Sequence, residues 1–164
     1  MRLIPKKNIT IVLPFPAQEV KHRLHNATLP LGHQPLPGYE QHFTFNGTVQ
    51  HYNFRISKIM RSPQDFAPII EGNIEPCQHG ALVFATFHLF KSTSLMFYFG
   101  MAVCLTLLYL FLFLLTNWVY VGLTLLAMGL HICVMHLSFK KQVKIGRKAL
   151  EDVLFSNNKE QQRL

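Results

Sequence analysis

The sequence predicts an α+β membrane protein, a small antiparallel sheet with N- and C-terminal helices that is interrupted by a two-helix transmembrane hairpin. Two observations lead to this fold class. No Asp, Glu, Lys or Arg occurs from Ser92 to Phe139, in a chain of 164 residues. Before that run, apolar and polar residues alternate in the manner of half-buried strands. We therefore expect a soluble part at 1–91, the hairpin at 92–139, a basic helix at 140–155 and a polar tail at 156–164.

The charge-free run is long enough for two membrane helices, at about 95–115 and 119–137. Each has roughly the 20 residues that cross about 30 Å of hydrocarbon. Lys91 precedes the run and five basic residues follow it, whereas the turn at Thr116-Asn117-Trp118 has none. The positive-inside rule then predicts a multi-pass protein of the cell membrane, with the bacterial inner membrane favoured and both termini cytoplasmic. Three Asn-X-Thr patterns point instead to a secretory lumen, but such short patterns often arise by chance.

If the run folds back on itself at its turn, small residues of the first helix come to the same level as small residues of the second. Small residues let two helix backbones approach closely. The predicted seam of the hairpin therefore consists of Gly100, Cys104, Phe111, Gly122, Gly129 and Cys133. The opposite face of the second helix carries Thr124, Met128, His131 and Met135. Polar groups inside a membrane usually face protein, so this face is the candidate docking surface for a partner helix. The alternative is a lipid-facing stripe in which His131 is hydrogen-bonded locally.

The soluble part is predicted to open with a strand from Ile9, followed by a helix that begins near Pro16. A loop rich in proline spans 29–41, and two β-hairpins follow at about 43–56 and 70–87. The helix at 140–155 is amphipathic and is expected to cover the sheet. Its basic residues are candidates for contacts with anionic lipid: Lys140, Lys141, Lys144, Arg147 and Lys148. The alternative for this helix is a lipid-sensing anchor.

The order strand, helix, antiparallel sheet and C-terminal helix resembles the helix-grip layout of START-like lipid-binding domains. A second resemblance rests on short stretches: Phe45-Asn-Gly-Thr-Val49, Phe54-Arg-Ile56, Phe66-Ala-Pro-Ile-Ile-Glu-Gly-Asn-Ile74 and His88 before a helical pair. Together these stretches resemble a group of uncharacterised small bacterial membrane proteins over about residues 43–155. That group implies no activity, and no residue takes a role from it.

Motifs for catalysis, nucleotide binding and metal binding are missing from the sequence. Nine histidines are present, but none has the ligand spacing of a zinc site. Glu71 and Glu75 share a strand face, which a solvated outer surface explains. No catalytic, cofactor-binding or metal-binding residue is therefore assigned, and no cofactor is expected.

The net charge of +8 fits an anionic lipid surface better than nucleic acid in a chain with this apolar run. The expected partners are the lipid bilayer with its anionic headgroups, together with a membrane protein or a second copy. The predicted function is that of a non-enzymatic accessory or scaffold protein. The alternative is a membrane-anchored domain that binds a lipid or another apolar ligand between its sheet and its terminal helix. An enzyme built from dispersed His and Glu residues is a third reading.

Overall fold

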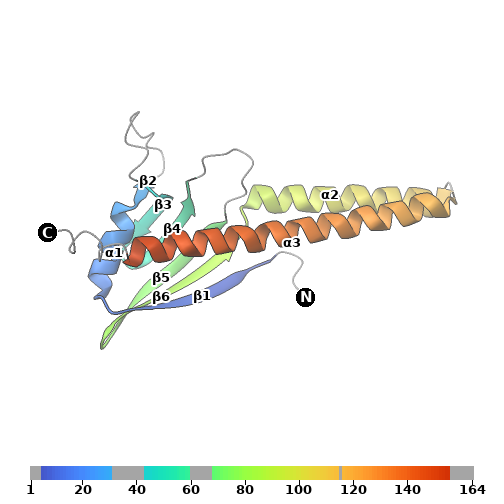
Figure 1. Ribbon diagram of the computed structural model, residues 1–164. Coiled ribbons are helices and arrows are strands. Elements are labelled where there is room, and N and C mark those ends of the chain that lie inside the picture. Colours follow the sequence, from blue (N-terminus) through green and yellow to red (C-terminus); the bar gives the residue numbers. More distant parts are fainter. Residues whose placement is uncertain (1–4, 31–42, 60–67, 115, 156–164) are drawn as a thin grey trace.

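The computed structural model describes residues 5–30, 43–59, 68–114 and 116–155. Its elements in chain order are β1 (Lys7–Leu13), α1 (Ala17–Asn26), β2 (Thr28–Pro30), β3 (Phe45–Gln50), β4 (Asn53–Lys58), β5 (Ile69–Cys77), β6 (Gly80–His88), α2 (Lys91–Tyr109), a π-helical segment (Leu110–Leu114) and α3 (Trp118–Phe155). The strands form one sheet on which α1 and part of α3 lie, and α2 and α3 extend beyond it as a helical pair (Figure 1). We call this projecting pair the arm.

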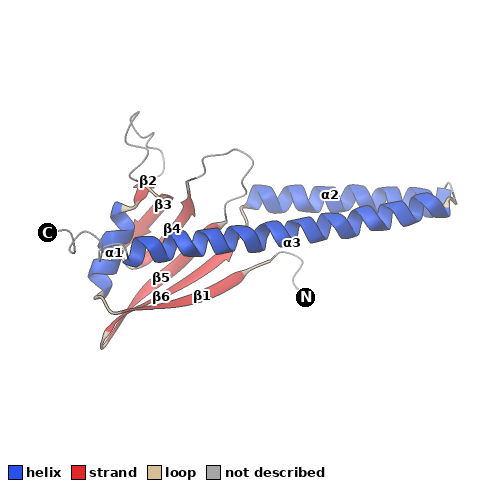
Figure 2. Ribbon diagram, viewed as in Figure 1, coloured by secondary structure: helices blue, strands red, loops and turns tan. Residues whose placement is uncertain are grey.

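The sheet has the strand order β1-β6-β5-β4-β3-β2. Neighbouring strands are antiparallel except β2 and β3, which pair in parallel. The first strand closes one edge by pairing with the last, from Lys7 opposite Phe87 to Leu13 opposite Ala81. Figure 2 shows the strands as one curved layer with the helices on one side. The first described strand therefore lies beside the segment that leads into the arm.

Alternating side chains explain why these segments form strands with one covered face. In β6 the residues Ala81, Val83, Ala85 and Phe87 are buried, and the residues between them are more exposed. A period of two sends successive side chains to opposite faces of a sheet. The inner faces of β4 and β5 add Phe54, Ile56, Ile70 and Ile74 to the same core.

The C-terminal half of α3 supplies the main cover of this core. Phe139, Val143, Leu150 and Leu154 are buried against the sheet and recur at helical spacing. Gly146 lies among them, and a Cβ added there would stand 3.1 Å from Cε1 of Phe87 and 3.6 Å from Cδ1 of Ile70. The absence of a side chain at this position therefore lets the helix backbone rest directly on the sheet.

The end of α3 is held by α1. Nη1 of Arg23 donates a hydrogen bond of 2.7 Å to the carbonyl oxygen of Leu154. The same guanidinium pairs with Glu19 and lies 4.1 Å from the ring centroid of Phe15. A cation is favourable at a helix C-terminus because the last carbonyl groups have no partner within the helix. Arg23 thus ties the first helix to the last turn of the cover helix.

The predicted fold class is wrong in treating the helical hairpin as a unit separate from the helix that covers the sheet. The six described strands precede the apolar helices and form one sheet. The expected second membrane helix and the expected basic helix are one continuous helix, α3. The helix continues through Lys140, where the sequence changes from apolar to basic. One stripe of α3 packs on α2 in its first half and on the sheet in its second half, so the helical periodicity is unbroken. A short strand, β2, also lies where a loop was predicted.

The predicted seam of the hairpin is wrong for its residues on α3. A Cβ added at Gly122 or Gly129 would meet nothing within 4 Å, and Cys133 is exposed. On α2, by contrast, Gly100 lies against His131. Phe111 of the π-helical segment stacks on Tyr120 with ring centroids 5.1 Å apart. Cys104, the remaining α2 member of the predicted seam, is half-buried.

The face proposed for a partner helix is instead the face that α3 turns toward α2 and the core. Thr124 is buried, and its hydroxyl donates to the carbonyl oxygen of Tyr120 at 2.8 Å. His131 stacks on Phe97 with ring centroids 5.1 Å apart, and its Nε2 has no hydrogen-bond partner among the described residues. Met128 is half-buried, and Met135 packs against the core. The polar stripe is therefore used within the chain.

Replacement of Gly146 by leucine should destabilise the fold by about 1–3 kcal/mol, because the new side chain has no room between helix and sheet. Gly129→Leu is the matched control on the same helix, since its Cβ enters open space. Urea unfolding of both variants measures the difference. Equal loss of stability in the two variants would contradict the close seating of α3 on the sheet.

Replacement of Gly100 by valine should displace the His131 ring, because a Cβ there would lie 2.9 Å from Nε2. The ring-proton NMR shifts of His131 report its stacking on Phe97. We expect these shifts to change in Gly100→Val and to stay in place in Gly122→Val. A shift change only in the Gly122 variant would restore the seam predicted from the sequence.

Candidate functional site: a basic groove between β1 and α3

A groove of about 460 Å³ lies between the start of β1 and the middle of α3. Its lining residues come from the start of the described chain and from α3. Figure 1 shows β1 and α3 side by side where the arm leaves the sheet. The residues lining it are Pro5, Lys6, Lys7, Ile9, His136, Phe139, Lys140, Val143, Lys144 and Arg147.

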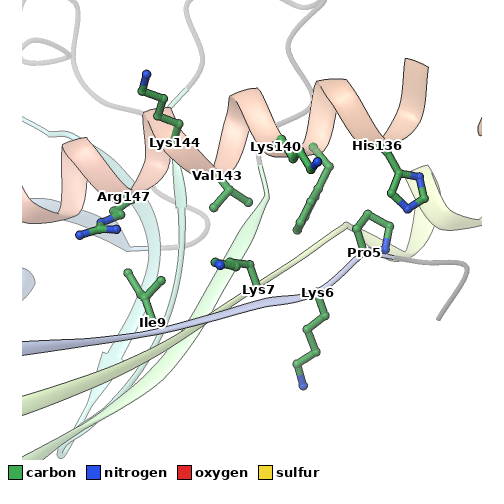
Figure 3. A pocket seen from close by; sticks show the side chains of 10 residues that line it. Pro5, Lys6, Lys7, Ile9, His136, Lys140, Val143, Lys144 and Arg147 are labelled. Atoms are coloured by element: carbon green, nitrogen blue, oxygen red, sulfur yellow. The ribbon is translucent and has the colours of Figure 1, made fainter. Parts of the chain in front are cut away.

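The groove has an apolar floor because both elements turn part of their core face into it. Phe139 and Val143 belong to the stripe of α3 that packs on the sheet, and Ile9 is a partly buried neighbour of the same core. Figure 3 shows Ile9 and Val143 facing one another across the groove, with the His136 ring beside Pro5. Burial of an apolar ligand group on this floor would be favoured by about 25 cal/mol per Å² of apolar surface.

The rim of the groove is strongly basic. Five of the ten lining residues are Lys or Arg, and none is Asp or Glu. Figure 3 shows Lys7 extending toward α3, whereas Lys6 and Lys144 point away from the floor on opposite sides. Nε of Arg147 donates to Oε1 of Glu151 at 2.7 Å, so this cation already has an acidic partner. The remaining excess of positive charge favours an anionic group.

The structure divides the basic residues that were predicted to contact anionic lipid. Lys140, Lys144 and Arg147 line the groove, whereas Lys141 and Lys148 are exposed on α3 and do not line it. Lysines therefore lie on both sides of the helix, and composition alone does not show which of them face the groove. The separation comes from which side of α3 faces β1.

Residues of β1 complete the groove, and sequence reasoning missed them. Lys7 and Ile9 belong to a strand that was expected to contribute only to the sheet. The charge of Lys6-Lys7 beside an alternating strand was the available signal. Its meaning depends on the pairing of β1 with β6, which brings the first strand next to the base of the arm.

The pocket predicted between the sheet and the terminal helix is filled by side chains. Ile70, Phe87, Leu150 and Leu154 are buried together there, and Gly146 brings the helix close to the sheet. The groove described above lies beside the sheet instead, between β1 and α3.

The outer face of the sheet carries a small cluster of charged residues. Oε1 of Glu71 lies 3.1 Å from Nε of Arg55, and its Oε2 lies 3.0 Å from Nε2 of His88. Oε1 of Glu75 accepts a hydrogen bond of 2.7 Å from Nδ2 of Asn73. Each glutamate therefore has a local partner on the solvated face. Among the described residues, no three His, Cys, Asp or Glu side chains converge as a metal site would require.

Comparison with known proteins finds no family, and it finds a distant likeness to a solved structure. No family model matches the chain, and no curated protein matches it. Among solved structures, the chain resembles the solution NMR structure of a Polyketide_cyc-like protein from Corynebacterium glutamicum. The identity is 8%, the TM-score is 0.44, and the match covers 96% of this chain and 94% of the other. A likeness at this level assigns this chain neither ligand nor activity.

The comparisons give no support to the predicted class of multi-pass membrane protein, to its bacterial inner-membrane location with both termini cytoplasmic, or to the accessory role at the membrane. The structure that the chain resembles is that of a Polyketide_cyc-like protein. Two helical stretches, Lys91–Leu114 and Trp118–Phe155, are long and apolar enough to cross a membrane, but length and composition alone do not establish a span. These predictions are therefore corrected, and the function is sought in the groove.

Proposed function

We propose that the chain is a binding domain for an anionic amphiphile, a ligand with a negatively charged head and a short apolar body. The observation that supports this function most directly is the composition of the groove between β1 and α3. Cationic side chains surround an apolar floor, and no carboxylate lies among the lining residues.

The two parts of the groove favour two parts of one ligand. Ammonium groups at Lys7 and Lys140 supply charged donors to a phosphate or carboxylate. The apolar floor of Ile9, Phe139 and Val143 would lie against hydrocarbon. A bare anion would leave this floor in water, and an uncharged apolar molecule would leave the cations without a partner. An amphiphile satisfies both.

Hexyl phosphate is a suitable probe because it is soluble and carries both groups. We expect it to bind more tightly than either inorganic phosphate or hexanol, as measured by isothermal titration calorimetry on the full chain in a neutral detergent. Replacement of both Lys7 and Lys140 by glutamine should weaken its binding by about threefold to tenfold, since exposed ion pairs contribute up to about 1 kcal/mol each. Added salt should weaken binding to the unmodified chain for the same reason.

The matched control is Lys21→Gln with Lys148→Gln, which changes the net charge equally on α1 and α3 but leaves every lining residue in place. This variant should lose less than twofold. Equal weakening in both variants would show that only the overall charge of the chain attracts the anion. Binding of hexanol as tight as that of hexyl phosphate would overturn the role of the cations.

A further inference from the structure

The arm exposes apolar side chains around most of its circumference. On α2 the exposed residues include Leu95, Met96 and Phe99, and on α3 they include Leu123, Leu126, Leu130, Val134 and Leu137. The only buried side chains along the arm are Phe97 on α2 and Val121 and Thr124 on α3, among the described residues up to Ser138. No Asp, Glu, Lys or Arg interrupts this surface from Ser92 to Phe139.

A surface of this kind has a partner, since soluble proteins rarely expose contiguous apolar patches of more than a few hundred Å². A protein partner that packs against a helix usually covers one stripe of it. One stripe on the arm would leave the apolar residues on the other sides in water. A hydrocarbon phase, in contrast, would cover every side of both helices at once.

The charges at the base of the arm indicate what surrounds such a hydrocarbon phase. Lys91 begins α2, and Lys140, Lys141 and Lys144 follow the apolar part of α3. The basic groove opens at the same level, where His136 and Phe139 line it. Cations beside an apolar surface complement an assembly whose interior is hydrocarbon and whose surface is anionic.

We infer that the arm contacts the acyl chains of an anionic lipid surface while the groove and its neighbouring lysines meet the lipid headgroups. This inference deepens the proposed function, because it names the source of the anionic amphiphile as a lipid assembly.

Vesicle flotation tests the inference with the full chain. The chain, held in neutral detergent, is mixed with vesicles of phosphatidylcholine alone or of phosphatidylcholine and phosphatidylglycerol at about 7:3, and the detergent is then removed. We expect most of the chain to float with the mixed vesicles. Moderate salt should release part of the chain from the mixed vesicles and leave flotation with the neutral ones unchanged, because it screens headgroup contacts that only the mixed vesicles supply.

Two outward-facing leucines of the arm, Leu126 and Leu130, are 62% and 57% exposed, so the fold does not depend on burying them. Replacement of both by glutamate should lower the floated fraction at least fivefold. Val12→Glu is the matched control, since Val12 is 71% exposed on β1, away from the arm. The control should float like the unmodified chain.

Binding of hexyl phosphate separates this inference from the proposed function. The Leu126→Glu and Leu130→Glu variant should keep that binding while it loses flotation. A chain that stays at the bottom of the gradient and forms a discrete oligomer in detergent-free buffer would overturn the inference, because a second copy would then cover the arm. Loss of hexyl phosphate binding with flotation intact would instead overturn the proposed function alone.

Discussion

The contact between Gly146 of α3 and the inner face of the sheet is the constraint on which the rest of the structure depends. Phe87 and Ile70 lie directly beneath this position, and a large side chain there would have to displace the Phe87 ring or the helix. The helix is continuous over Trp118–Phe155, so its seating on the sheet also fixes the direction of the arm. The same seating sets the distance between α3 and β1, and hence the width of the groove.

A second contact, at the C-terminal end of α3, also holds this helix against the sheet. Arg23 donates to the carbonyl oxygen of Leu154, and its side chain is largely buried between Phe15 and α3. Two elements far apart in the sequence are thereby held to one side of the sheet. The groove lies between β1 and α3, and it combines part of the core with exposed cations. This is why one site offers both an apolar floor and a charged rim.

Local patterns in the sequence predicted much of the sheet and little of the site. Alternation at Phe54 and Ile56 and at Val83 and Ala85 marks strands, and these residues are buried in β4 and β6. The pairing of β2 with β3 was not predictable in this way, because β2 has three residues and one is proline. The groove depends on the proximity of β1 to α3, which no local pattern encodes.

The seam of the arm shows a different limit. Reflection about the turn gives the level at which residues of α2 and α3 meet, but it does not give the rotation of each helix about its own axis. Small residues suggested a face through Gly122 and Gly129, whereas the packed face carries Thr124 and His131. The sheet determines this rotation, because the stripe that contacts α2 must continue into Phe139 and Val143 on the core.

The most direct test of this account is to map where hexyl phosphate touches the chain by methyl NMR with labelled isoleucine and valine. The account predicts that the methyl signals of Ile9 and Val143 shift on titration, while those of the fully buried Ile56 and Ile74 stay in place. Ligand-induced shifts that avoid Ile9 and Val143, or that spread evenly over the chain, would contradict the groove between β1 and α3 as the binding site.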